Sequence, residues 1–153
     1  MSYSAKNVAK LVLLFSHEQL VSDMTNLKLQ KVLYYIQAYF LSVKNKPCFD
    51  DEIYAWKLGP VVQSVYYEYY PFVNNTIWDD KFTEECQSIE KCFSYIDLTI
   101  IRKLVNYFAK KSAFELVNRT HEEDPWRATE QSCVITCDKI KAYYDENPVI
   151  KGE

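Results

Sequence analysis

Glycine is scarce in this 153-residue chain, which contains only Gly59 and Gly152. Tight turns often need glycine, so its scarcity disfavours a β-sandwich with many turns and favours long helices. It also excludes a glycine-rich loop of the kind that cradles nucleotide phosphates. The sequence therefore predicts a mainly α-helical protein with few tight turns.

Closely paired cysteines are lacking as well. The five cysteines show no CxxC spacing, and neither of the two histidines lies near one of them in the sequence. Zinc sites have tighter, paired ligand spacing, so we expect no bound metal and no cofactor. The prediction is a set of free, buried thiols in a reducing compartment.

Long hydrophobic runs and a positive net charge are missing. No apolar run approaches the roughly 20 residues that span a bilayer, and Leu11–Phe15 is too short for a signal peptide. We therefore expect a cytoplasmic protein with no membrane partner. The net charge of −3 attracts no phosphates, and Lys28 and Lys31 are too few to form a basic helix face. These features argue against nucleic-acid binding, including repression of the protein's own operon.

Helical periodicity dominates what is present. Apolar residues recur at helical spacing over residues 8–15 and 29–43, and Thr25 is a suitable N-cap for the second stretch. Ser112 with Glu115 has the spacing of a capping box. No repeat or linker divides the chain. We expect one compact domain over residues 1–153, a bundle of about six helices.

Further helix boundaries follow from capping residues and prolines. Thr83 and Thr136 are suitable N-caps, Thr99 is expected to restart or extend the helix that begins near Thr83, and Pro125 is expected to begin another turn. The last helix is expected to end at Asn147-Pro148.

One short extended segment is predicted near residues 52–58, where apolar and aromatic side chains alternate. Gly59 and Pro60 end this segment. Pro60 fits the first position of a new helix, because its missing N–H costs nothing there. We expect that helix to stop at Pro71, and Phe72–Asp80 to form a loop.

Tyrosine is the residue type in surplus, with 13 in the chain. In a helix from Pro60, Tyr66 and Tyr69 share the apolar side, whereas Tyr67 and Tyr70 project elsewhere. Tyrosine and tryptophan are enriched at interface hot spots, so the surplus indicates either a partner surface or an aromatic-rich core with a wet edge. The candidate partner-binding residues are Tyr54, Trp56, Lys57, Tyr67, Tyr70 and Trp78.

A catalytic interpretation would start from His121, which lies next to Thr120 and the acidic residues 122–124. Adjacent acids at a helix end are usually solvated, and this run has no apolar surroundings in the sequence to shift a pKa. No cysteine has the setting of a nucleophile. We therefore predict that the protein is not an enzyme. A hydrolase-like enzyme or a ligand-binding regulator that uses Thr120 and His121 is the alternative.

Three blocks of this sequence resemble the Panacea domain, also called the SocA-like antitoxin domain. They are residues 26–35, residues 49–52 with 55–62, and residues 112–116 with Thr120, His121, Pro125 and Trp126. Their order and spacing agree with the family over residues 26–126. The family-motif scaffold residues that the resemblance implies are Leu29, Gln30, Lys31, Tyr34, Gly59, Pro60, Tyr66, Thr120, His121, Pro125 and Trp126.

The resemblance implies a helical antitoxin from a two-gene toxin–antitoxin system of the kind carried by prophages, some relatives being phage-associated proteins. Such antitoxins usually neutralise a cognate toxin by direct contact, and the toxin gene is expected next to this one. A cellular protease could be a second partner. This chain has Tyr54 where relatives often have an acidic residue and Ala38 where glycine is common. If surface residues that vary among relatives determine which toxin is bound, these two positions are candidates for that role.

Overall fold

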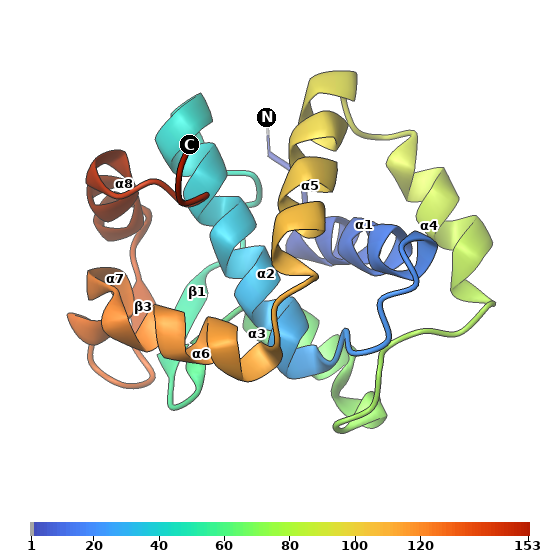
Figure 1. Ribbon diagram of the computed structural model, residues 1–153, viewed down its shortest axis with the longest axis horizontal. Coiled ribbons are helices and arrows are strands. Elements are labelled where there is room, and N and C mark those ends of the chain that lie inside the picture. Colours follow the sequence, from blue (N-terminus) through green and yellow to red (C-terminus); the bar gives the residue numbers. More distant parts are fainter. Residues whose placement is uncertain (1) are drawn as a thin grey trace.

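The computed structural model describes residues 2–153, which fold into eight α-helices and a small antiparallel sheet (Figure 1). The mainly helical fold class is confirmed, with eight α-helices instead of about six. The turn expected at Pro125 is the short helix at residues 124–127, and the stretch expected to continue from Thr83 past Thr99 is divided into two separate helices, which explains part of the difference. The elements are α1 (Ala5–Glu18), α2 (Asn26–Tyr39), the π-helical turn η1 (Phe40–Lys44), β1 (Ile53–Trp56), β2 (Gly59–Val61), α3 (Gln63–Glu68), the 3-10 turn η2 (Tyr70–Phe72), α4 (Phe82–Glu90), α5 (Tyr95–Phe108), α6 (Ala113–Glu122), α7 (Asp124–Arg127), β3 (Val134–Ile135) and α8 (Cys137–Glu146).

Helix α2 is the centre of the fold. It contacts α1, α5, α6, α8 and β2, and it runs through the middle of the view in Figure 1, with α5, α1 and α4 on one side and α7 and α8 on the other. Every residue of α2 except Leu27 is buried. A helix that is apolar on more than one side must be covered on all of them, and the surrounding elements provide that cover.

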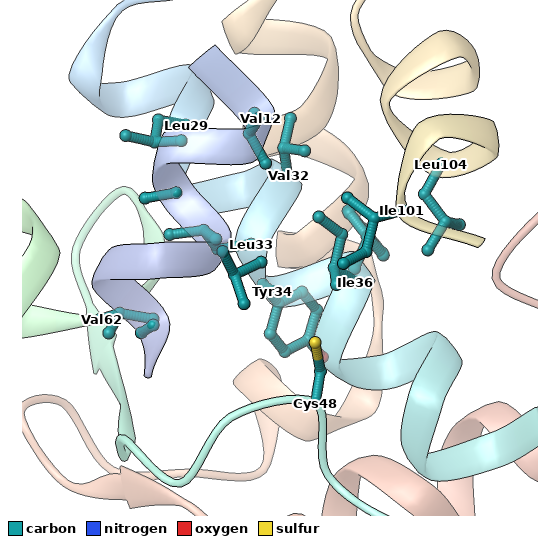
Figure 2. Close-up of a cluster of buried hydrophobic side chains, with 14 of the residues drawn as sticks. Val12, Leu29, Val32, Leu33, Tyr34, Ile36, Cys48, Val62, Ile101 and Leu104 are labelled. Carbon is teal, nitrogen blue, oxygen red and sulfur yellow. The ribbon is translucent and has the colours of Figure 1, made fainter. Parts of the chain in front are cut away.

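The main core forms where α1, α2 and α5 meet. Leu29, Val32, Leu33 and Ile36 of α2 lie in the same cluster as residues from α1, α5 and the chain after β2. Figure 2 shows this cluster, with the labelled residues Val12, Leu29, Val32, Leu33, Tyr34, Ile36, Cys48, Val62, Ile101 and Leu104. Burial of these side chains is the main favourable term in the fold.

Buried polar side chains on α2 satisfy the backbone of the loops around it. Gln37 donates from Nε2 to the carbonyl of Phe49 (2.8 Å) and accepts at Oε1 from the amide of Cys48 (2.8 Å). Lys28 donates from Nζ to the carbonyl of Ala109 (2.6 Å). A buried loop amide or carbonyl without a partner is costly, so these polar residues fix the loops on the central helix.

Three predicted helix starts are confirmed. The hydroxyls of Thr25, Ser112 and Thr136 accept from the backbone amides three residues later, at 3.4, 3.1 and 3.2 Å. At Ser112, the capping box is half formed, because the Glu115 carboxylate lies 3.6 Å from Nζ of Lys111 instead of at the Ser112 amide. N-capping depends on neighbours in the sequence, which is why it could be predicted.

The extended segment is confirmed, but Pro60 does not begin a helix. It lies in β2, which pairs with β1 in an antiparallel hairpin where Ala55 faces Pro60 and Trp56 faces Gly59. Strand β3 pairs with the other side of β1, so β2 is an edge strand. Proline is tolerated on an edge strand, where its missing N–H is not needed for pairing. Helix α3 begins later, at Gln63.

Two further helix boundaries differ from the predictions. Thr83 lies inside α4, which begins at Phe82, and a break after Glu90 separates α4 from α5. Helix α5 begins before Thr99, because the hydroxyl of Ser94 accepts from the amide of Asp97 (3.1 Å) and caps it.

All five cysteines are free, but only two are buried. Cys48 and Cys86 lie in the core, and burial raises the pKa of the Cys86 thiol to about 11. Cys92, Cys133 and Cys137 are exposed, so the prediction of buried thiols is wrong for these three. Among residues 2–153, no three His, Cys, Asp or Glu side chains lie close enough together to hold a metal ion. None of the helices in this range is long and apolar enough to cross a membrane.

Candidate functional site

A pocket of about 470 Å³ opens between α2, the β1–β2 hairpin and α3. Its volume lies within the ~300–1,000 Å³ usual for ligand pockets. We call it the hairpin pocket. It is lined by Asn26, Leu27, Gln30 and Lys31 from α2, by Trp56, Lys57, Leu58 and Val61 from the hairpin, and by Tyr66, Tyr70, Val73 and Asn74 from α3 and the segment after it.

Polar side chains of α2 hold the walls of the hairpin pocket together. Asn26 donates from Nδ2 to the carbonyl of Tyr66 (3.0 Å), and Gln30 donates from Nε2 to Oδ1 of Asn26 (2.9 Å). The amide of Val62 in turn donates to Oε1 of Gln30 (2.9 Å). Two of these three hydrogen bonds are buried and the third is partly buried, so α2 holds both the end of the hairpin and α3.

Lys31 lies behind this chain and is fully buried. Its Nζ donates to the carbonyl of Pro60 (3.0 Å), and burial lowers the pKa of the amine to about 7. Gly59 leaves the space that the Lys31 side chain occupies: a Cβ at position 59 would lie 2.7 Å from Cε of Lys31 and 2.8 Å from Oγ1 of Thr120. The Thr120 hydroxyl donates to the carbonyl of Val117 in its own helix (2.8 Å).

Three aromatic side chains line one wall of the pocket, Trp56, Tyr66 and Tyr70, and Tyr67 lies beside them. We call these four the aromatic face. The ring centroids of Trp56 and Tyr66 are 5.0 Å apart in an edge-to-face arrangement, and those of Tyr66 and Tyr70 are 5.8 Å apart. Tyr67 and Tyr70 are 62% and 60% exposed, as predicted, and Tyr69 is buried. Tyr66 is half-buried and belongs to this face instead of the core.

Two residues of the third motif block support the hairpin from behind. Trp126 donates from Nε1 to the carbonyl of Trp56 (2.8 Å). The ring of His121 stacks on Trp126 with centroids 4.1 Å apart. Its Nε2 is buried and has no hydrogen-bond partner in the described part of the chain. Pro125 is buried in the short helix α7, which positions Trp126.

The six candidate partner-binding residues do not all lie together. Trp56, Lys57 and Tyr70 line the hairpin pocket, and Tyr67 adjoins it through Trp56. Tyr54 is on the same face of β1 as Trp56 but does not line the pocket. Trp78 lies elsewhere, with its ring stacked on His17 at a centroid distance of 4.1 Å.

A buried carboxylate was missed from the sequence. Glu123 accepts at Oε1 from the hydroxyls of Tyr35 (2.6 Å) and Tyr144 (2.8 Å), and at Oε2 from Nε of Arg119 (3.2 Å). Burial and then the charge of Glu123 raise the pKa of the Tyr35 hydroxyl. The i, i+4 spacing from Arg119 was the available signal. This network joins α2, α6 and α8, so Glu123 is structural and not a solvated acid.

The other motif residues build the scaffold around the pocket. Leu29 and Tyr34 are in the core, and the hydroxyls of Tyr34 and Tyr144 are hydrogen-bonded at 3.1 Å. Lys28 and Lys31, the lysines considered for a basic helix face, are both fully buried and form no such face.

Comparison with known proteins gives one finding. The family model described as antitoxin SocA-like, Panacea domain, matches residues 29–127, which is more than half of the chain and contains every family-motif scaffold residue named above. No curated protein and no solved structure matches.

Proposed function

The chain belongs to the SocA-like Panacea antitoxin family, and we propose that it neutralises a cognate toxin by binding it directly. Membership of an antitoxin family implies a toxin partner. We propose that the antitoxin contacts this toxin directly and that the adjacent gene encodes the toxin. Blocking of the toxin and its delivery to a cellular protease both begin with such a contact.

The observation that carries the proposal is the exposed part of the aromatic face beside an apolar pocket. Tyr67 and Tyr70 expose most of their surface, and the neighbouring Leu58 and Val73 are exposed too. Water-exposed apolar patches of this kind mark protein interaction sites, and tyrosine carries much of the binding energy in such interfaces. Surface tyrosines can be removed without loss of core packing, so their role in binding can be tested separately from folding.

The test is co-expression of this protein with the product of the adjacent gene, followed by growth measurement and co-purification. Tyr67→Ala and Tyr70→Ala should each weaken toxin binding about tenfold or more, because hot-spot tyrosines cost ~2 kcal/mol or more when truncated. Tyr95→Ala is the matched control. Tyr95 is 82% exposed at the start of α5 and does not line the hairpin pocket.

Two outcomes would contradict the proposal. If the adjacent gene product is harmless alone, or remains toxic beside this protein, neutralisation of that product is wrong. If all three tyrosine variants protect equally, the toxin binds another surface. Thermal melting of each variant shows whether a loss of protection has a folding cause, since exposed substitutions usually change stability by about 0.5 kcal/mol or less.

The enzyme alternative uses Thr120 and His121. The Thr120 hydroxyl is fully buried and already donates within its own helix, and His121 packs on Trp126. These contacts favour a structural role. We expect His121→Ala to lower the free energy of unfolding by about 1–3 kcal/mol through loss of the stacked ring. An unchanged melting temperature with complete loss of protection would favour the enzyme or ligand-binding alternative instead.

A further inference from the structure

The turn at Val73 has a backbone conformation that valine rarely adopts. Its φ of +55° and ψ of −116° are those of the first central residue of a type II′ turn. The amide of Asn75 closes this turn by donating to the carbonyl of Phe72 (2.9 Å). Glycine is the usual residue at such a position, because it adopts a positive φ without steric cost. A β-branched residue there is a genuine outlier, so Val73 is strained and lowers the stability of the fold.

Anchors on both sides of the turn impose this conformation. Before the turn, Phe72 packs against the hydrophobic core and its amide donates to the carbonyl of Tyr69 (3.1 Å). After the turn, Ile77 is buried and its amide donates to the carbonyl of Met24 (2.9 Å). The chain must reverse between these two fixed points, and the surrounding structure therefore holds Val73 in its unfavourable conformation.

The side chain of Val73 contributes little to the core of the free protein. It is 67% exposed and lies at the rim of the hairpin pocket, which Tyr70 and Asn74 also line. Leu20 also has a positive φ, of +60°, but it is not β-branched and it follows α1, where a left-handed residue commonly ends a helix. Strain without a benefit to folding is typical of binding sites, because the benefit comes from the partner.

The charge and shape of this rim favour one kind of partner. Among the described residues that line the pocket, Lys57 is exposed, and none is an aspartate or glutamate. A second copy bound about a twofold axis would bring this surface against itself, with like charges on both sides. A small ligand would be enclosed by the pocket, whereas Tyr70 and Val73 leave most of their surface open to solvent. The rim therefore fits a different protein, with an apolar surface bordered by carboxylates.

We propose that Val73 is a toxin-contact residue, held in a strained turn so that the toxin buries its side chain together with those of Tyr67 and Tyr70. This inference rests on the proposed function and adds a residue to its site. Burial of the exposed two thirds of the valine surface contributes to affinity in the complex. The strain lowers the stability of the free protein. Stability and toxin affinity therefore depend on Val73 with opposite signs.

The experiment compares Val73→Gly with the wild type by urea denaturation and by isothermal titration calorimetry with the product of the adjacent gene. Glycine adopts the positive φ without strain, so the equilibrium constant for unfolding should fall about threefold or more. The same variant lacks the apolar side chain, so toxin binding should weaken about fivefold or more. Val73→Ile keeps a β-branched apolar side chain and should retain most of the affinity that Val73→Gly loses.

Leu20→Gly is the matched control. It removes an 88% exposed apolar side chain at a positive φ, away from the residues that line the hairpin pocket. Its stability should not fall, and its toxin affinity should equal that of the wild type.

Each contrary result has a definite meaning. Unchanged affinity in Val73→Gly would overturn the inference, and weaker binding by Tyr67→Ala and Tyr70→Ala would still leave the proposed function standing. A Val73→Gly protein that is no more stable than the wild type would show that the turn is not strained and would also overturn the inference. So would an equal loss of affinity in Leu20→Gly, because the effect would then not belong to the pocket rim. Absence of binding by the wild type would overturn both the inference and the proposed function.

Discussion

Replacing Gly59 with alanine should be the most damaging single-methyl change in this protein. Gly59 has φ +112°, a region that residues with a Cβ rarely adopt, and such backbone strain costs ~1–3 kcal/mol. The new methyl would also lie 2.7 Å from Cε of Lys31 and 2.8 Å from Oγ1 of Thr120. Neither neighbour moves easily, because Lys31 is held by the Pro60 carbonyl and Thr120 by its own helix.

Overpacking of a filled interior costs a further ~1–3 kcal/mol. The reduced freedom of the unfolded chain returns about 0.4–1 kcal/mol. We therefore expect Gly59→Ala to lower the free energy of unfolding by about 1–5 kcal/mol, centred near 3 kcal/mol, a large share of the 5–15 kcal/mol typical of a domain. Urea denaturation followed by tryptophan fluorescence measures this difference. The comparison is valid if the free energy of unfolding falls with urea concentration at the same slope in the wild type and the variant.

Gly152→Ala is the matched control. Gly152 also has a positive φ of +90°, but nothing lies within 4 Å of where its Cβ would be, and it lies in an exposed turn that can relax. Its cost should stay below about 1 kcal/mol. The reasoning would be refuted if Gly59→Ala cost no more than Gly152→Ala. The double variant Gly59→Ala with Thr120→Ala removes one of the two close contacts, so the two changes should couple favourably by about 0.5 kcal/mol or more.

Two other predictions concern buried charges. The first compares the wild type with Lys31→Met. The free energy of unfolding of the wild type, relative to that of the variant, should rise by up to ~1.4 kcal/mol per pH unit between about pH 7 and 10, because the unfolded lysine holds a proton that the folded amine has lost. Denaturation at several pH values measures this difference, and a difference that does not depend on pH would contradict the low pKa. The second is that Glu123→Gln should lower the free energy of unfolding by about 3–5 kcal/mol, because Arg119 is left buried without its carboxylate. The control Glu122→Gln, at an exposed position, should change the free energy of unfolding by less than about 0.5 kcal/mol. Equal losses of stability in the two variants would show that the Glu123 network is dispensable.

Local signals in the sequence predicted local structure well. The caps at Thr25, Ser112 and Thr136 were found because each hydroxyl meets an amide three residues later. Pro60 was misplaced because proline suits both the first turn of a helix and an edge strand. The choice between the two depends on pairing with β1, which no local pattern reports. The prediction of Thr83 as an N-cap was wrong for a similar reason. In the sequence alone, a threonine inside the first turn of a helix cannot be told from a capping threonine, because the contacts around it are unknown.

The candidate site was predicted in part. Trp56, Tyr67 and Tyr70 were named from the aromatic surplus, and Lys57 because it lies among them in the sequence; all four lie at or beside one pocket. Trp78 was named for the same reason but stacks on His17 in another part of the fold. Aromatic type and helical spacing indicate that a side chain is available for binding. They do not indicate which surfaces come together.

The amino-acid sequence by itself determined the helical class, the main helix starts and the family, because these depend on composition, on short-range periodicity and on motif order. Only the tertiary structure decided which charged side chains of the site are buried and which of them have a partner of opposite charge. Lys28 and Lys31 are three positions apart on one helix, and nothing in their spacing says that one meets Asp23 while the other lies uncompensated behind Gly59. Burial and charge pairing are set by residues distant in the chain, and the cost of desolvation depends on them.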